Sequence, residues 1–455
     1  MVATQVWNPW LMAAESPGRT AVVAANERMT FAELTALASA LASGLMRRGV
    51  PEGAVVATSM PSGPAFFALA LATLRAGYGL FPISGDVPEP LRTTLLKISG
   101  AVLDVWQDDA RDAEVPRTAV AELAAGPLLP WPSVPAGHLV WKTSGTTGRP
   151  AVVARTRPWY GYRGVAVFDK YFSGPELGPH VMANPTFHLG TLGPALYALQ
   201  AGSAVVVQKH PSPSAFAALV DEHRADSAFM PPGLLALLVE SGLAPRHALK
   251  IVSHGGSPCG APVKHAAIEL LGPVLHEYYG TSAGVISEIS TEEWLRRPGS
   301  VGRPLPGVRV SVLDRERVVA PGETGEIQVV PRSVDRRRSE QILHTGDVGR
   351  LDDDGYLHVL GRISPDAGTD EAVLENLVRS LTGVSEVVVL SDPPRCHVEA
   401  ADTAGIEGSV RSLARQVRVP EIDVQLWPLG ALPRTPSGKV QRAALIDEMT
   451  TAREM

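Results

Sequence analysis

Alternation of short apolar strands with helical segments is the feature that most limits how this 455-residue chain can fold. Residues 30–50 have apolar side chains at helical spacing, residues 53–60 form a short apolar run, and residues 63–84 predict a helix that leads into a strand. The runs SAVVVQ (203–208) and LKIVSHGG (249–256), with their β-branched Val and Ile residues, look like parallel strands that are buried on both faces. We therefore expect an α/β protein with stacked, mostly parallel sheets covered by helices.

The pattern changes after Arg303. Residues 307–330 alternate with a period of two and contain turn residues, which predicts a small antiparallel β unit. GYLHVLGR (355–362) adds one more strand, and a helix–strand–helix pattern follows from Ile363 onward. We expect a large N-terminal domain over residues 1–361 and a small, mobile α+β domain over residues 362–455.

Composition excludes several classes of protein. The net charge is −6 at pH 7, so no basic field indicates a nucleic-acid partner. The two cysteines, Cys259 and Cys396, exclude a disulfide framework and a cysteine-rich metal site. The start of the chain lacks the pattern of a signal peptide, and the most apolar run, 65–74, is too short to cross a membrane. We expect a soluble cytoplasmic protein with no membrane partner.

TSGTTG at residues 143–148 is the first candidate for chemistry. Its hydroxyls, glycines and backbone N–H groups suit an anion, and it follows the predicted strand HLVWK (138–142). It is not a Walker A sequence, and a polar surface turn is the structural alternative. Phosphate loops of this kind usually carry a lysine just after the glycines, whereas this chain has Ala151.

Three later stretches favour a nucleotide site. YYGTSAG (278–284) follows the apolar run PVLHE and offers an aromatic ring and two hydroxyls. HTGD places Asp347 in a tight turn, where a carboxylate can bind ribose hydroxyls. LPRTPSGKVQR (432–442) carries Lys439 on a Pro/Ser/Gly turn, from which a lysine can neutralise charge that develops on phosphate.

TSGTTG, YGTS, TGD, GR and PSGK, in this order, resemble the adenylate-forming (AMP-binding) superfamily. That group includes acyl- and aryl-CoA synthetases, peptide-synthetase adenylation domains and luciferase, and the resemblance covers nearly the whole chain. It implies an enzyme that uses ATP and Mg²⁺ to convert a carboxylic acid to an acyl-AMP and pyrophosphate. The acyl group would then pass to CoA, to a carrier-protein thiol or to an amine, in a biosynthetic setting such as secondary metabolism.

The resemblance also implies roles for particular residues. The loop at 143–148 would wrap the β- and γ-phosphates, Tyr279 would stack on adenine, Ser282 would contact the α-phosphate and Asp347 would bind the ribose. Lys439 would bridge the substrate carboxylate and the α-phosphate, and Arg362 would lie where the two domains join. The implied nucleotide-binding residues are Thr143, Ser144, Gly145, Thr146, Thr147, Gly148, Gly255, Gly256, Ser257, Pro258, Tyr279, Gly280, Thr281, Ser282, Asp347 and Arg362. The implied catalytic residues are Lys439, Arg362 and His188.

NPTFHLGTLG (184–193) matches a family stretch that borders the acid pocket, which would place His188 beside the acid. The alternative for His188 is a structural histidine. The apolar residues 188–202 suit an aromatic or medium-chain acyl acid, and nothing resembles the acidic anchor that amino-acid-activating members use for an α-amine.

Three positions depart from the family. Ala151 replaces the loop lysine, and we consider Arg149, Arg155 or Lys142 as its substitute. Ala283 replaces the glutamate that helps to hold Mg²⁺, so the sequence assigns no metal ligand, although Glu288 follows downstream.

The third departure follows Arg362, where residues 363–377 (ISPDAGTDEAVLENL) are several residues shorter than the family pattern and hold the single Gly368. Asp366 is a candidate for the hinge role. Thioester-forming members place a loop from this region along the pantetheine tunnel, so the short segment puts transfer to CoA in question.

Other hypotheses compete with the ligase. The replacements at Ala151 and Ala283 motivate a degenerate, non-catalytic member of the family that acts by nucleotide or protein interaction. An NAD-dependent dehydrogenase lacks support because no G-x-G-x-x-G follows an early strand. A serine hydrolase lacks support because the stretch around Ser257 misses the second glycine of G-x-S-x-G.

Overall fold

The computed structural model describes residues 8–108, 114–142, 152–154, 177–208, 211–281, 284–314, 317–331, 342–363, 369–417, 419, 421–434, 440–442 and 444–446. These residues form two compact units. The first contains the described residues up to Phe229 together with Pro245–Lys250, and the second contains Met230–Ala244 together with the described residues from Ile251 onward. The predicted domain boundary at 361–362 lies inside the second unit and stays a prediction.

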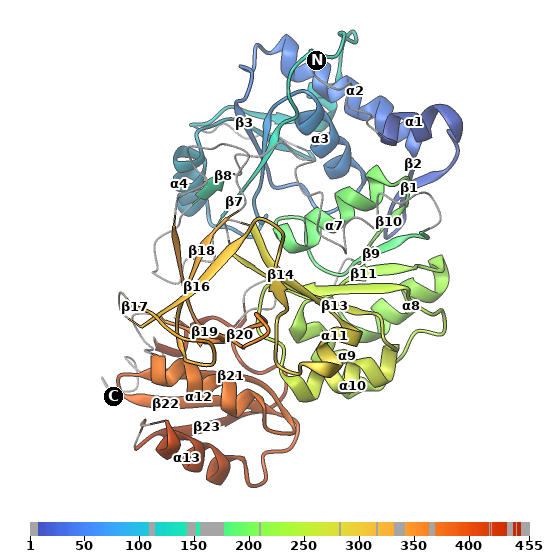
Figure 1. The fold of residues 1–455 in the computed structure, drawn as a ribbon. Helices are drawn as coiled ribbons and strands as arrows, with labels where there is room; N and C mark the ends of the chain where they lie inside the picture. The colour runs from blue at the N-terminus through green and yellow to red at the C-terminus, as the bar shows by residue number, and fades with distance from the viewer. Residues whose placement is uncertain are drawn as a thin grey trace, which may run out of the picture. The chain divides into compact units, whose positions relative to one another are not determined.

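Two sheets in the first unit carry its parallel strands (Figure 1). One has the order β6 (Arg117–Ala119), β5 (Ala101–Trp106), β3 (Val55–Thr58), β4 (Gly79–Pro82), β7 (His138–Lys142) and β8 (Val152–Ala154), and only the β7–β8 pair is antiparallel. In the other, β11 (Ser227–Phe229), β9 (His180–Met182), β10 (Val205–Val207) and β1 (Thr20–Ala24) run parallel, and β2 (Glu27–Thr30) lies antiparallel at the edge. The expected buried parallel strands are therefore confirmed for this unit.

Helices of the first unit begin where the sequence provides caps. Thr30 and Glu33 form a reciprocal capping box at the start of α2 (Phe31–Arg47), and Ser212 caps α8 (Pro213–His223). The predicted helix that leads into a strand is α3 (Pro64–Arg75) followed by β4, and α3 is buried along nearly its whole length. The remaining helices are α1 (Asn8–Glu15), α4 (Glu89–Ser99), α5 (Val120–Ala124) and α7 (Leu189–Gln200).

A buried polar cluster ties α4 to β5 in the first unit. Arg92 and Asp104 are at most 1% exposed, and the guanidinium donates to both carboxylate oxygens, with distances of 2.6 Å from Nη2. Trp106 Nε1 donates to the same carboxylate at 2.9 Å. A buried ion pair of this kind needs such hydrogen bonds, because its desolvation otherwise exceeds the Coulomb gain.

The second unit contains the small antiparallel sheet that the sequence predicts. Its order is β17 (Arg317–Val318), β16 (Arg309–Asp314), β18 (Gly325–Val330), β19 (Leu343–Leu351) and β20 (Leu357–Arg362), and every described pair is antiparallel. A second set of strands runs β15 (Arg303–Pro304), β14 (Gly284–Ser290), β13 (Leu275–Thr281) and β12 (Ile251–Gly255), with β12 and β13 parallel. The helices α9 (Pro232–Ser241), α10 (Ala261–Leu271) and α11 (Thr291–Arg296) accompany these strands.

One detail differs from the sequence prediction. The apolar run PVLHE suggests a strand that ends before the two tyrosines, whereas β13 continues through Tyr278 and Tyr279 to Thr281. The reason is a hairpin partner: β14 pairs antiparallel with β13 and satisfies its backbone as far as Thr281. Tyr279 is therefore held in a sheet.

The last part of the second unit is a three-stranded sheet with two helices. β21 (Val384–Ser391) pairs antiparallel with β22 (Pro394–Ala400), which pairs parallel with β23 (Asp423–Trp427). α12 (Thr369–Arg379) and α13 (Ile406–Gln416) pack their apolar residues against the same face, where Val387, Val389 and Val398 are buried. The helix–strand–helix prediction from Ile363 onward is confirmed, and β22 and β23 are additional strands.

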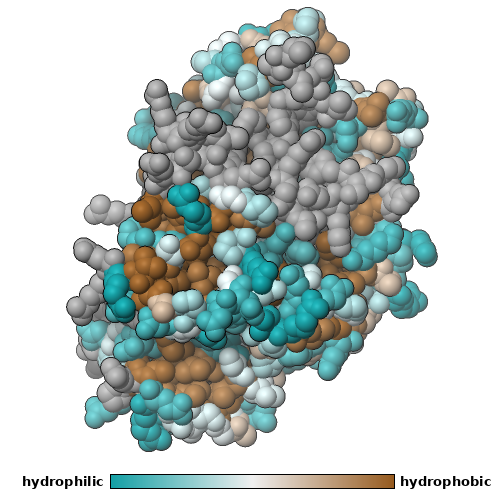
Figure 2. All heavy atoms as spheres, viewed as in Figure 1, coloured by the Kyte–Doolittle hydropathy of each residue, from teal (hydrophilic) through white to brown (hydrophobic). Residues whose placement is uncertain are grey.

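The described surface carries single exposed aliphatic side chains. Leu128, Val318 and Ile342 are each more than half exposed and come from separate segments. On the face shown in Figure 2, hydrophobic patches alternate with hydrophilic side chains. Scattered exposure of this kind is normal for a folded protein and indicates no particular partner. In the described parts of the chain, no helix combines the length and the apolar character needed to span a membrane.

Candidate functional site

The strand end at Gly255 and Gly256 needs glycine twice, for two different reasons. Gly255 lies opposite Tyr278 in the parallel β12–β13 pair, and a β-carbon at Gly255 would lie 2.5 Å from the Tyr278 carbonyl oxygen. Gly256 has a φ of +85°, a left-handed conformation that disfavours other residues. Ser257 and Pro258 continue the chain from this strand end. The result is a close backbone approach at the place where the sequence predicts adenine.

Asp347 is the centre of a second group in the same unit. It lies on β19 directly opposite Arg362 of β20. The Tyr279 hydroxyl donates to Asp347 Oδ2 at 2.6 Å, and Arg362 Nη1 donates to Oδ1 at 3.2 Å. Three side chains that the sequence singles out separately are thus in direct contact, although Tyr279 and Asp347 are 68 residues apart in the chain.

Local backbone geometry sets the direction of the Asp347 side chain. The Asp347 N–H donates to Thr345 Oγ1 at 3.0 Å, and that hydroxyl donates to the Ile327 carbonyl on β18 at 2.6 Å. Gly346 between them has a φ of +70° and accepts from the Ile363 N–H at 2.8 Å. The Thr-Gly-Asp motif therefore forms a fixed turn within the strand, as its glycine and hydroxyl predict.

The members of this group differ in how far they are exposed to solvent. Asp347 is 6% exposed, whereas the Arg362 side chain is 48% exposed. Burial, the negative charge of Asp347 and the hydrogen bond to it all raise the pKa of the Tyr279 phenol above its ordinary value. The phenol therefore stays protonated at neutral pH and acts as the donor in this pair.

This donor and acceptor set fits the ribose of a nucleotide. A carboxylate accepts hydrogen bonds at both oxygens, which is what a pair of ribose hydroxyls requires, and Tyr279 and Arg362 hold the Asp347 carboxylate in one orientation. Of the two glycines at the end of β12, Gly256 borders open space, because a β-carbon there would meet no atom within 4 Å.

Among the described residues there is no cluster of three His, Cys, Asp or Glu side chains that could hold a metal ion. Glu288, the candidate substitute for a glutamate at position 283, lies on β14 with its Oε2 3.5 Å from His276 Nε2. It is therefore already engaged within the β13–β14 pair.

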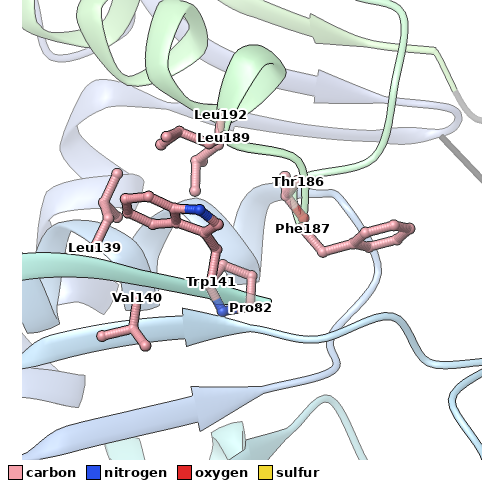
Figure 3. A pocket seen from close by; sticks show the side chains of 8 residues that line it. All are labelled: Pro82, Leu139, Val140, Trp141, Thr186, Phe187, Leu189 and Leu192. Atoms are coloured by element: carbon pink, nitrogen blue, oxygen red, sulfur yellow. The ribbon is translucent and has the colours of Figure 1, made fainter. Parts of the chain in front are cut away.

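His188 lies in the first unit, at the residue that precedes α7. Its ring packs on Phe187 with a centroid distance of 4.4 Å. Beside it is a small pocket, shown in Figure 3, in which the Trp141 indole faces leucines of α7. The lining residues are Pro82, Leu139, Val140, Trp141, Thr186, Phe187, Leu189 and Leu192. None of these eight carries a charge, and the Thr186 hydroxyl is bonded to Ser62 Oγ at 3.1 Å.

Several predicted positions lie outside the described residues. They are Thr143, Ser144, Gly145, Thr146, Thr147, Gly148, Arg149, Ala151, Arg155, Ser282, Ala283, Asp366, Gly368 and Lys439. Gly280 and Thr281 are described and form the end of β13. Lys142 is exposed at the end of β7.

The sequence interpretation missed two features. Trp141 lines the pocket, and its only sequence signal is the aromatic residue in the strand that precedes the Thr/Ser/Gly run. Lys264 and Glu277 form a buried ion pair, with Nζ 2.5 Å from Oε2 and the ammonium 4.7 Å from the Trp294 ring centroid. The scarcity of lysine in this chain was a signal that could have drawn attention to Lys264.

Comparison with known proteins places the chain in a family. The model of the AMP-binding enzymes matches residues 11–134 and 138–334. The chain therefore belongs to the AMP-binding enzymes, the adenylate-forming superfamily that its motifs resemble, and the prediction of an adenylate-forming ligase is confirmed. ATP and Mg²⁺ are the cofactors of this class.

Among similar sequences is the fatty acid–[acyl-carrier-protein] ligase ScoC of Streptomyces coeruleorubidus, 26% identical over 96% of this chain and 94% of ScoC. Another is the probable non-canonical nonribosomal peptide synthetase CymA of Salinispora arenicola, 27% identical over 97% of this chain. The chain spans 6% of the length of CymA.

Solved structures show the same fold. The o-succinylbenzoate coenzyme A synthetase MenE of Bacillus subtilis, in complex with ATP and a magnesium ion, has a TM-score of 0.79 and 24% identity over 97% of this chain and 100% of MenE. The amide bond synthetase McbA of Marinactinospora thermotolerans has a TM-score of 0.76 and 24% identity over 97% of this chain and 99% of McbA. The predicted α/β fold is confirmed.

Proposed function

We propose that this chain activates a carboxylic acid with ATP and then transfers the acyl group to a nucleophile. A substrate carboxylate oxygen attacks the α-phosphorus, the bond from that phosphorus to the bridging α,β-oxygen breaks, and pyrophosphate leaves with the bond's electron pair. Bound Mg²⁺ would neutralise charge on the phosphates. The observation that carries the proposal is that Tyr279 and Arg362 both contact Asp347. The same unit also contains the glycine strand end at Gly255.

In this proposal the residues position the nucleotide. Asp347 accepts from the ribose hydroxyls, and its own direction is maintained by the Tyr279 phenol and the Arg362 guanidinium. The residues from Thr143 to Gly148, with Ser282, contact the phosphates, and Lys439 bridges the carboxylate and the α-phosphate. Catalysis comes from orientation of the reactants and from stabilisation of charge at the phosphate.

The acid in this proposal is aromatic or a medium-chain acyl acid. The apolar side chains beside His188 support it, because Trp141, Leu189 and Leu192 lie together there and none of the neighbouring residues that line this small space carries a charge. A free α-ammonium group would find no carboxylate among these eight residues.

The acceptor is a thiol or an amine. ScoC is named as a ligase of an acyl-carrier protein, and McbA as an amide bond synthetase, so both kinds of acceptor occur among similar proteins. The short connection after Arg362 favours an amine, because it leaves little chain for a loop that would line a pantetheine tunnel. α12 already begins at Thr369. It packs closely on β20, since a β-carbon at Gly361 would lie 2.6 Å from the Ala372 carbonyl oxygen. A biosynthetic role and a cytoplasmic location stay predictions from the sequence.

ATP–pyrophosphate exchange without an acceptor tests the proposal. We expect exchange with benzoate or hexanoate and little with phenylalanine. Asp347→Ala is expected to lower the exchange rate at least tenfold, whereas the matched control Asp353→Ala, at an exposed carboxylate in the neighbouring turn, keeps it. Absence of exchange with all three acids, in a protein that still binds ATP, would favour the non-catalytic hypothesis.

CoA, N-acetylcysteamine and benzylamine, offered separately to the activated acid, then distinguish the acceptors. Amide formation without thioester would support the amine. Thioester formation with CoA would show that the short connection does not prevent transfer to a thiol.

A further inference from the structure

The segment on either side of Lys439 covers the second face of the three-stranded sheet. Along β21, Val387 and Val389 face the helices α12 and α13, whereas Val388 and Leu390 face the other side. Leu432 and Leu445 are buried against that other side, at 2% and 0% exposure. Leu432 and Leu445 are therefore part of the core of this region.

The two flanks of residues 435–439 are joined to each other. Arg434 and Val440 form an antiparallel β-bridge. The Gln441 N–H donates to the Pro433 carbonyl at 2.8 Å. The described residues before and after positions 435–439 are therefore fixed to each other.

A buried carboxylate holds the first flank. Glu399 on β22 is 2% exposed, and its Oε1 accepts from Arg434 Nη2 at 2.6 Å and from Ser385 Oγ at 2.9 Å. Its Oε2 accepts from the Leu432 N–H at 3.1 Å. This single side chain therefore binds both the backbone and the arginine just before residue 435.

A second buried carboxylate holds the other flank. Glu375 on α12 is 5% exposed and accepts from the Arg442 guanidinium and, at 2.8 Å, from the Val389 N–H. Arg442 also donates from Nη1 to the Val389 carbonyl at 2.9 Å. The residue three positions after Lys439 is thus tied to both α12 and β21.

The charges in this region balance. Glu386 connects the first anchor to Arg379, since it accepts from Arg379 at 2.9 Å and lies 4.0 Å from Arg434. Three carboxylates, at positions 375, 386 and 399, face three arginines, at positions 379, 434 and 442. Burial of a carboxylate destabilises the fold unless the carboxylate is paired in this way. Apolar side chains could attach these flanks to the sheet without that desolvation penalty. Two of the three arginines, Arg434 and Arg442, lie on either side of segment 435–439, which contains Lys439.

We propose that Glu399 and Glu375 are positioning residues for adenylation: through Arg434 and Arg442 they anchor the two flanks of segment 435–439, and this anchoring sets how Lys439 reaches the reacting groups. This inference rests on the proposed function, in which Lys439 bridges the carboxylate and the α-phosphate. A misplacement of about 1 Å at such a group costs on the order of 10²-fold in rate. The anchors act on the rate of the chemical step and not on ATP affinity.

Kinetics of Glu399→Gln test the proposal, with whichever of benzoate, hexanoate and phenylalanine gives the fastest exchange. We expect kcat for exchange to fall at least tenfold while the KM for ATP changes less than twofold. Glu407→Gln is the matched control, because Glu407 pairs with Arg411 on the exposed face of α13 in the same region, and it is expected to leave both constants unchanged. Equal kcat values for Glu399→Gln and the parent would overturn the proposal.

A double-variant cycle separates this inference from the role of Lys439 itself. If Glu399 acts through Lys439, adding Glu399→Gln to Lys439→Ala lowers kcat less than twofold further. A double variant whose loss equals the product of the two single losses would overturn the positioning role. Exchange at the parent rate in Lys439→Ala alone would instead contradict the proposed function of that lysine.

Proteolysis supplies a readout that needs no acid. We expect the lysine-specific protease Lys-C to cleave after Lys439 at least tenfold faster in Glu399→Gln and in Arg442→Ala than in the parent, with Glu407→Gln unchanged. Arg434→Lys, which keeps the charge, is expected to recover part of the protection that Arg434→Ala loses. Unchanged cleavage in the anchor variants would overturn the proposal, because it would show that these carboxylates do not restrain the segment that contains Lys439.

Discussion

Replacing Tyr279 with phenylalanine removes one hydroxyl from the centre of the proposed ribose site. The hydroxyl donates to Asp347 Oδ2 at 2.6 Å, and Asp347 is only 6% exposed, so water cannot readily take its place. A hydrogen bond to a charged group is worth about 1.5–3 kcal/mol. Arg362 still contacts the other oxygen, but its side chain is half exposed and 3.2 Å away, so it compensates only in part. We expect Tyr279→Phe to lower the free energy of unfolding by about 2 kcal/mol.

Urea denaturation of the parent and variant measures this loss. Tyr356→Phe is the control, since within the described residues its hydroxyl makes no hydrogen bond while its ring lies 4.5 Å from the Arg303 guanidinium. ATP affinity measured by calorimetry should fall less than fivefold in Tyr279→Phe, because the ring that would stack on adenine remains. A change in unfolding free energy of less than about 0.5 kcal/mol, the range expected of a surface substitution, would refute the importance of this hydrogen bond.

Three further outcomes follow from the described residues. Gly256→Ala places a β-carbon at a φ of +85°, so we expect a loss of about 1–2 kcal/mol in unfolding free energy and weaker ATP binding, both measurable on one purified sample. Arg92→Met leaves the Asp104 carboxylate, which is 0% exposed, without its main partner, and we expect a loss of about 3–5 kcal/mol in urea denaturation, against no change for Arg415→Met at an exposed position of α13. Burial lowers the pKa of His180 from 6.5 to about 3, so this histidine is neutral in the folded protein and charged in the unfolded chain over that interval. The contribution of neutral His180 to the free energy of unfolding is therefore fully present above about pH 6.5. It is lost as the pH falls toward 3, by up to about 1.4 kcal/mol per pH unit. His180→Gln should flatten the pH dependence of unfolding between pH 6.5 and 4, and an unchanged slope would contradict the assignment.

Local patterns in the sequence were enough to predict most of the architecture. The runs at 203–208 and 249–256 predicted the buried strands β10 and β12, and the period-two alternation after Arg303 predicted the antiparallel sheet from β16 to β20. Ordered motifs also identified the family, because five short signatures in one order carry more information than any single one. These inferences succeed because helix and strand periods, turn residues and motif order are properties of neighbouring residues.

Contacts between distant residues were decided only by the tertiary structure. Nothing in the sequence indicated that the Tyr279 phenol donates to Asp347, because that contact depends on the extension of β13 by its hairpin partner and on the register of β19 against β20. The same holds for Glu375 and Glu399, which look like ordinary surface glutamates in the sequence but are buried in the structure beside Arg442 and Arg434. A charged residue reveals its partner only when packing brings the two together, since one-dimensional patterns contain spacing but not register.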